Sequence, residues 1–214
     1  MSLLKFVIGN YINILNSLWR HIELVGISVM VGMIISIPLG IFLSRHKRTA
    51  GPVLAVAGTI QTIPGLVMLG FALILFGIGI LPALVVLSLY AILPILRNTY
   101  TGITEVEPSY IDAGRGIGMT NMQILFKVEL PLALPSIISG IRISTVYIVS
   151  WATLAGLIGA GGLGDLIWTG LSNYNSNYIL AGAIPSAILA FALSGLIGFL
   201  QRLLTPRGLK GVRV

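Results

Sequence analysis

Long stretches without a charged residue are the feature that most constrains how this chain can fold. Four such runs, without Asp, Glu, Lys or Arg, lie between Glu23 and Arg45, Arg48 and Arg97, Arg142 and Asp165, and Asp165 and Arg202. A helix needs about 20 apolar residues to cross the hydrocarbon of a bilayer. Hydrophobic residues make up 56% of the 214-residue chain and charged residues 9%, too little polar material for a water-facing shell. The sequence predicts an integral membrane protein.

The second run is long enough for two helices, because the glycines and the proline between Phe76 and Pro82 favour a tight turn. We therefore predict an all-α protein with five transmembrane helices. Their expected positions are 23–44, 53–76, 79–97, 134–158 and 178–201. One membrane domain over residues 1–214 accounts for the whole chain.

The charges between the predicted spans are distributed unevenly across the membrane. If the loop at 45–52 is cytoplasmic, so are residues 98–131 and the C-terminal tail. That side then carries Arg45, Lys47, Arg48, Arg97, Arg115, Lys127, Arg202, Arg207, Lys210 and Arg213. The other side keeps only Lys5 and Arg20. Because Lys and Arg gather on the cytoplasmic side, we predict a cell-membrane protein with its N-terminus outside and its C-terminus in the cytoplasm.

The remaining composition excludes several classes of protein. The net charge of +7 sits in short clusters between apolar runs, which argues against a nucleic-acid partner. The chain has no cysteine, so it has no disulfide or thiolate site. Residues 1–20 predict an amphipathic helix on the outer surface without a cleaved signal peptide. His21 and His46 have no partner ligand at useful spacing, and we expect both to be solvated, with no metal site and no cofactor in this chain.

Residues 98–131 form the only substantial polar stretch between the predicted spans, and they predict two short helices. Pro108 suits the first position of a helix. A capping box from Thr120 to Gln123 suits the start of the second helix. The turn between them is made possible by Gly114, Gly116 and Gly118.

Such a hairpin could dock in the groove of another protein. A connector lying flat on the membrane is the alternative on composition alone. A DNA-reading helix-turn-helix is disfavoured, because the loop offers only Arg115 and Lys127 as cations.

At this loop the sequence resembles the permeases of binding-protein-dependent ABC importers. Their cytoplasmic signature is Glu-Ala-Ala, three residues, Gly, nine residues, then Ile-x-Leu-Pro. The same spacing here gives Asp112-Ala113-Gly114, Gly118 and Val128-Glu129-Leu130-Pro131. Asp replaces Glu, Gly replaces the second Ala and Val replaces Ile, while the spacing is preserved.

The resemblance implies a type I importer permease, in which this loop is the coupling helix that sits in a cleft of a cytoplasmic ATPase. The residues that it assigns to coupling are Asp112, Ala113, Gly114, Gly118, Val128, Leu130 and Pro131. It implies no catalysis in this chain, with ATP and Mg²⁺ held by a dimer of the partner ATPase. It further implies an extracellular substrate-binding protein and a second permease subunit, identical or homologous.

Three further segments resemble osmoprotectant permeases, which import glycine betaine, carnitine, choline or related quaternary amines. These segments are Gln61 to Gly65, Leu93 to Ile103 and Gly159 to Asp165. Methionine-type permeases share the five-span plan and are the nearest alternative.

A polar residue and a helix-breaking proline interrupt the second predicted span at Gln61 and Pro64. Such residues in hydrocarbon usually face protein or a water-filled cavity, so we place both near the translocation path, with helix packing as the alternative. Tyr147 and Trp151 are candidates for the same path, with a role as lipid-interface anchors as the alternative. Arg142 is expected to extend to the cytoplasmic interface.

Gly159, Gly161 and Gly164 spell a dinucleotide fingerprint, but they follow a membrane span rather than a strand, so a cofactor loop is rejected. We expect a turn here, followed by a short outer helix over 163–171. An outer gate or a contact with the binding protein would use Gly161, Gly162, Gly164 and Asp165, with a plain packing turn as the alternative. Close helix packing is expected at Gly32, Gly40, Gly140, Gly195 and Gly198.

Two other classes of protein fit the sequence less well than a permease does. A stand-alone secondary transporter would need ionisable residues within the membrane for ion coupling, which the sequence lacks. An intramembrane enzyme would need paired carboxylates, a nucleophile with its base, or a metal site within the spans, and none is present.

Overall fold

The computed structural model describes residues 3–205, and that part of the chain is helical without any strand. The helices are α1 (Leu3–Gly9), α2 (Tyr11–Arg45), α3 (Lys47–Thr62), α4 (Gly65–Phe76), α5 (Ile80–Thr104), α6 (Pro108–Gly116), α7 (Asn121–Ile124), α8 (Leu130–Ala155), α9 (Leu163–Ser172) and α10 (Ser176–Leu204). A π-helical turn, Leu125–Glu129, joins α7 to α8, and a 3₁₀ turn, Gly156–Ile158, follows α8. Arg207, Lys210 and Arg213, predicted for the cytoplasmic tail, lie outside the described residues.

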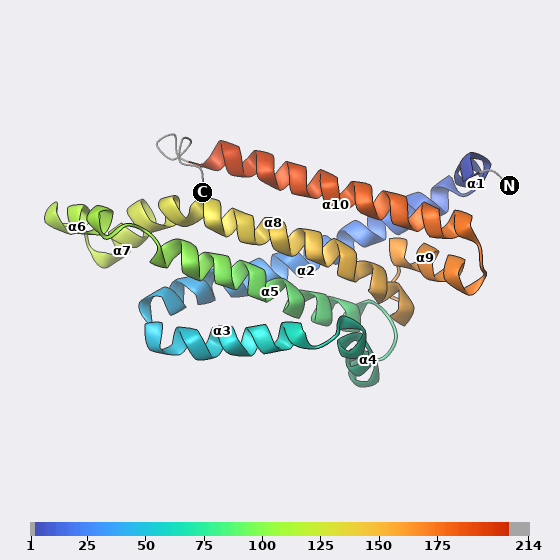
Figure 1. Ribbon diagram of the computed structural model, residues 1–214, viewed down its shortest axis with the longest axis horizontal. Helices are drawn as coiled ribbons and strands as arrows, with labels where there is room; N and C mark the ends of the chain where they lie inside the picture. The colour runs from blue at the N-terminus through green and yellow to red at the C-terminus, as the bar shows by residue number, and fades with distance from the viewer. Residues whose placement is uncertain (1–2, 206–214) are drawn as a thin grey trace.

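Four long helices run roughly along one direction, as Figure 1 shows, with α8 between α5 and α10. The short helices α6 and α7 lie at one end of this bundle, and α1 and α9 lie at the other. Helix α3 runs along the edge of the bundle next to α5, and α4 projects sideways from it. The predicted cytoplasmic loop and the predicted outer helix therefore lie at opposite ends of the molecule.

The first span is longer than predicted. Helix α2 has 35 residues, which corresponds to about 52 Å at 1.5 Å per residue and exceeds the hydrocarbon thickness. The separate amphipathic helix expected over 1–20 is therefore wrong, because α1 ends at Gly9 and the rest of that segment is the first part of α2. No glycine or proline interrupts the chain between Tyr11 and Gly26, so the helix continues beyond the apolar stretch.

The second span, predicted over 53–76 with an interruption at Gln61 and Pro64, is broken into two helices near that interruption. Helices α3 and α4 meet at an angle of 91°. The break lies at Ile63 and Pro64, where Ile63 is extended with ψ 129° because the residue before a proline avoids the helical region. Counted as one broken span, α3 and α4 bring the number of candidate spans to five, the predicted number.

The other predicted spans agree with the structure within a few residues, except that α5 continues past residue 97 to Thr104. The third span, the fourth and the fifth correspond to α5, to α8 and to α10. The predicted turn before the third span is present, with φ angles of +80° at Gly77 and +129° at Gly79.

The core is formed where α2 and α8 pack against α5. A Cβ on Gly32 of α2 would lie 2.8 Å from Cβ of Ala91 in α5, and one on Gly140 of α8 would lie 2.8 Å from the carbonyl oxygen of Pro94. Gly40 likewise faces Thr99. These three glycines confirm the expected close packing. At Gly195 the prediction is wrong, because no atom lies within 4 Å of its Cβ position.

Gly65, the first residue of α4, allows the α3–α4 corner to close on the core. A Cβ at this position would overlap the ring of Trp151, which stacks on Tyr90 at 5.0 Å between ring centroids. We predict that Gly65→Ala lowers the free energy of unfolding by about 1–3 kcal/mol, because the added methyl displaces the indole. Unfolding in detergent, followed by tryptophan fluorescence, measures the change.

Gly70→Ala is the matched control in the same helix, because nothing lies within 4 Å of its Cβ position. It should leave stability unchanged or raise it by up to about 1 kcal/mol through helix propensity. Equal losses at the two positions would contradict the assigned contact with Trp151.

Candidate functional site

The polar loop forms a hairpin of the kind predicted, although it is shorter than 98–131. Helix α6 begins at Pro108, the predicted first position. Gly118 makes the turn with φ +81°. The capping box at α7 is confirmed, since Thr120 N donates to Gln123 Oε1 at 2.8 Å and Gln123 N donates to Thr120 Oγ1 at 3.3 Å. Gly114 and Gly116 lie within α6 and do not make the turn.

The second helix of the hairpin continues past Pro131 into the long helix α8. Helix α7, the π-helical turn and α8 follow one another without a break from Asn121 to Ala155. Pro131 is the second residue of α8 and closely follows the π-helical turn, so its missing N–H falls next to an existing irregularity of the helical hydrogen-bond ladder. A movement of the loop therefore acts directly on α8.

The residues of the signature motif divide between the surface and the inside of the hairpin. Asp112 and Ala113 are exposed, and Asp112 pairs with Arg115 at 3.4 Å. Gly114 is buried, with its Cβ position 3.4 Å from Ile124 and 3.5 Å from Met119. Of the second part of the signature, Val128, Leu130 and Pro131 are half-buried.

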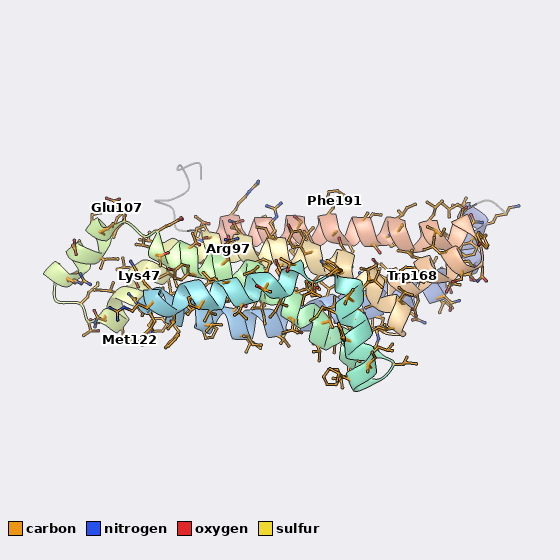
Figure 2. All side chains as sticks on the ribbon, turned by 60° about the horizontal axis from the view of Figure 1, so that its bottom comes forward. Lys47, Arg97, Glu107, Met122, Trp168 and Phe191 are labelled. Atoms are coloured by element: carbon orange, nitrogen blue, oxygen red, sulfur yellow. The ribbon has the colours of Figure 1, made fainter. Side chains whose placement is uncertain are left out.

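Large apolar side chains are exposed around this hairpin at the end of the molecule. We call them the loop patch: Tyr110, Ile117, Met122 and Phe126, with 50%, 76%, 62% and 59% exposure. Figure 2 shows Met122 and Glu107 at the end of the bundle where Lys47 also lies. An apolar patch beyond the membrane end of the helices is typical of a protein–protein contact.

An ion pair that the sequence did not reveal ties this loop to the first span. Glu129, only 2% exposed, accepts hydrogen bonds from both terminal nitrogens of Arg45 in the last turn of α2. The Arg45 Nη1 to Glu129 Oε1 distance is 3.0 Å. The chain has only six acidic residues. The position of Glu129 between the apolar residues Val128 and Leu130 was the signal in the sequence that could have revealed this ion pair.

We predict that Arg45→Ala destabilises the protein by about 3 kcal/mol, because it leaves the buried Glu129 carboxylate without its counter-charge. Glu129→Gln should cost less, since it leaves behind only a partly exposed guanidinium. The midpoint temperatures of thermal unfolding, measured on purified protein in detergent, rank the stability of the two variants. Arg48→Ala, at an exposed neighbouring position, should change little, and equal losses for all three would contradict the ion-pair argument.

The α3–α4 corner brings together three of the four residues assigned to the path. Pro94 in α5 has no N–H to give to the carbonyl of Tyr90 four residues earlier, and Gln61 Nε2 donates to that carbonyl at 3.1 Å. Tyr90 Oη donates to the carbonyl of Ile63, directly before Pro64. Trp151 then stacks on Tyr90. Their contacts explain how the corner is held, and a role in transport stays a prediction.

Tyr147, the fourth of these residues, lies elsewhere, along the groove that α8 makes with its neighbours. A hollow of about 430 Å³ is lined by Ser139, Arg142, Ile143, Val146, Tyr147 and Ser194. A second hollow of about 670 Å³ continues toward the loop end and is lined by Asn98, Gly102, Glu105, Val106, Glu107, Tyr110, Leu132, Pro135, Ser136, Ser139, Gln201 and Thr205. Ser139 lines both hollows, and together they form what we call the α8 groove.

The glycine-rich turn before α9, at the end of the molecule opposite the hairpin, closes against the first half of α2. Gly161 and Gly162 have φ angles of +84° and +88°, and their Cβ positions lie 3.1 Å from Arg20 and from His21. Arg20 Nε donates to the carbonyl of Ala160 at 3.3 Å. The expectation that His21 is solvated is wrong, because its ring is fully buried with Nε2 3.1 Å from the carbonyl oxygen of Val149.

Helix α9 confirms the predicted short outer helix and begins at Leu163. A Cβ on Gly164 would overlap the carbonyl of Thr153, and the same carbonyl accepts Trp168 Nε1 at 3.1 Å. Asp165 lies in the first turn of α9, and burial raises the pKa of its carboxyl. The predicted gate residues therefore form a close joint between α2, α8 and α9, at the end where Figure 2 shows Trp168.

A bundle of helices long and apolar enough to cross a membrane, with a polar groove along one side and a polar hairpin at one end, is the architecture of a membrane permease. Comparison with known proteins agrees. Residues 12–209 match the model of the family described as binding-protein-dependent transport system inner membrane component. The chain belongs to this family.

Curated relatives cover almost the whole chain. It is 44% identical over 212 residues to the glycine betaine/carnitine/choline transport system permease protein OpuCB of Bacillus subtilis, covering 99% of this chain and 98% of the relative. It is 44% identical to the choline transport system permease protein OpuBB of the same organism, covering 99% and 97%. It is 40% identical to the osmoprotectant import permease protein OsmW of Salmonella typhimurium, covering 98% and 100%.

Among solved structures, a chain of the inward-facing MetNI methionine ABC transporter has the same fold. The TM-score is 0.81 at 25% identity, with 90% of this chain and 96% of that chain covered. The predicted fold class, an ABC importer permease of type I, is confirmed.

Proposed function

We propose that this chain is the membrane-spanning subunit of an ATP-driven importer for quaternary-amine osmoprotectants such as glycine betaine, carnitine and choline. The observation that carries the proposal is the 40–44% identity, over nearly the full length, to permeases named for these solutes. Methionine is the runner-up solute, supported by a structural match at 25% identity. The lower identity makes the quaternary amines the better choice.

Energy comes to this chain from a separate ATPase dimer that binds ATP and Mg²⁺. The loop patch supports this, because Ile117 and Met122 are apolar, largely exposed and next to the Gly118 turn. Exposed Asp112 and Arg115 beside the patch add polar contacts that can set the orientation of docking. The loop would then pass movement to α8 through the π-helical turn.

Two permease subunits and an external binding protein complete the proposed transporter. Four or five spans enclose little space, and α10 presents large exposed apolar side chains such as Ile188 and Phe191 to its surroundings. In Bacillus subtilis, two permease proteins, OpuCB and OpuCD, carry the same transport-system name. A homologous second subunit is therefore proposed, with the N-terminus outside and the loop patch in the cytoplasm.

Isolation of this chain from its own membranes through an affinity tag tests the assembly. We expect an ABC ATPase, a second permease and a substrate-binding protein to copurify, and the reconstituted complex to take up glycine betaine, carnitine or choline only when ATP is supplied. Uptake without ATP, or uptake of methionine in place of the quaternary amines, would contradict the proposal.

The turn of the hairpin gives a sharper test of ATPase docking. Gly118→Val should abolish copurification of the ATPase, because a β-branched residue is strained at φ +81° while its side chain meets no neighbouring atom. Gly116→Val is the matched control, since that position is equally open and has an ordinary helical backbone. Membrane insertion should be unchanged in both, and retention of the ATPase by the Gly118 variant would count against docking at this turn.

A further inference from the structure

The exposed face of α8 is unusually polar for a membrane helix. Ser139, Arg142 and Tyr147 follow one another along this face and line the α8 groove. Ser194 and Gln201 of α10 and Asn98 of α5 contribute further polar groups from the two sides. Figure 1 shows how α8 lies between these two helices over most of its length.

Such a face cannot lie against lipid tails. Polar groups in hydrocarbon cost several kcal/mol each unless they have partners, so they turn toward protein or a water-filled cavity. The groove exposes one large aliphatic side chain, Ile143 at 42%, whereas Ile188 and Phe191 of α10 and Ile34 of α2 are more exposed on other surfaces. This combination is expected of a surface that faces protein or water inside an assembled transporter.

Arg142 is the cation of this groove, whose loop end also carries the carboxylates of Glu105 and Glu107. It has no acidic partner among residues 3–205. It is the thirteenth residue of the 26 in α8, far from both helix ends. The ion pairs among residues 3–205 are Arg20–Glu23, Arg45–Glu129 and Arg115–Asp112. The guanidinium instead crosses to α10, where Nε donates to Ser194 Oγ at 2.8 Å and Nη1 lies 3.3 Å from the Cβ position of Gly198. The expectation that Arg142 reaches the cytoplasmic interface is thus replaced by a lateral contact.

A guanidinium has five N–H donors, and only Nε has a partner among the described residues. The two terminal nitrogens can therefore bind a carboxylate through paired hydrogen bonds. Tyr147, 52% exposed in the same groove, offers an aromatic face. Such a face attracts a quaternary ammonium. The two residues are five positions apart, about 7.5 Å along the helix axis and about 140° around it, and both line the same hollow.

We propose that the α8 groove is part of the translocation path and that it recognises zwitterionic solutes at two points. Arg142 binds the carboxylate, and the ring of Tyr147 contacts the quaternary ammonium. This inference rests on the proposed function and adds a selectivity to it. Glycine betaine and carnitine carry both groups, whereas choline carries only the ammonium, so the groove distinguishes the first two solutes from the third.

Uptake of the three solutes by the complete reconstituted transporter tests the two contacts separately. Arg142→Gln should lower glycine betaine and carnitine uptake about tenfold relative to choline, the size expected for one charge-assisted contact. Tyr147→Leu should lower uptake of all three, because all share the ammonium, while Tyr147→Phe should retain it. Arg202→Gln, an exposed arginine of α10 that does not line the groove, is the control and should leave the ratio unchanged.

A general structural defect would lower uptake of all solutes alike and would not move the betaine-to-choline ratio. An unchanged ratio in the Arg142 variant therefore overturns the inference while leaving the proposed function intact. Failure of the unaltered transporter to take up any of the three solutes overturns both. A drop confined to the carboxylate-bearing solutes supports the inference.

Cysteine labelling tests, independently of any uptake measurement, whether the groove is accessible to water. The chain has no cysteine, so Val146→Cys in the groove and Phe191→Cys on α10 each introduce a single thiol. Both positions are near the middle of their helices, and Phe191 is 80% exposed. In the assembled transporter a water-soluble maleimide should label Cys at 146 and not at 191. Protection of position 146 would show that the groove is closed to water and would overturn the assignment.

Discussion

The structure depends on the close approach of three helices, α2, α5 and α8. Glycine at the contact points lets the backbones meet, and hydroxyl groups then bond across the interfaces to carbonyls of α5. Ser36 of α2 donates to the carbonyl of Ile92 at 3.0 Å, and Ser144 of α8 donates to that of Ala91 at 3.0 Å. Between membrane helices lipid removes most of the hydrophobic driving force, so packing and such bonds supply the attraction. This three-helix core is the rigid frame to which the other elements attach.

This three-helix core explains how one chain can combine the proposed ATPase docking site with the proposed solute path. The hairpin is joined to α8 without a flexible linker and to α2 through the Arg45–Glu129 pair. Movement at the loop patch would therefore act on the helix that carries Arg142 and Tyr147. At the other end the turn around Gly162 closes on α2. The loop patch, the α8 groove and the joint around Gly162 are thus three surfaces of the same packed core, an arrangement compatible with rigid-body rocking.

Much of this architecture follows from the sequence because membrane insertion and helix capping are local properties. Charge-free runs located α5, α10 and the second half of α8, Pro108 marked the start of α6, and Thr120 marked the start of α7. The errors arise where a helix continues without a stop signal, as at the start of α2, or where a proline changes direction rather than interrupting a straight span. Pro64 was noticed as unusual, but its 91° bend depends on the packing of the corner against Trp151.

The sequence by itself determined that the chain is a membrane protein, how many apolar segments it has and where the polar hairpin lies along the chain. Hydropathy, charge and turn chemistry act over a few residues, so they can be read without a fold. Only the tertiary structure decided that Gln61 satisfies the carbonyl freed by Pro94 and that His21 is buried 128 residues from its partner. It also decided that Arg142 forms no ion pair within the described part of the chain. These facts depend on which distant segments meet, because a buried or membrane-embedded polar group is stabilised by its partner in space and not by its neighbours along the chain.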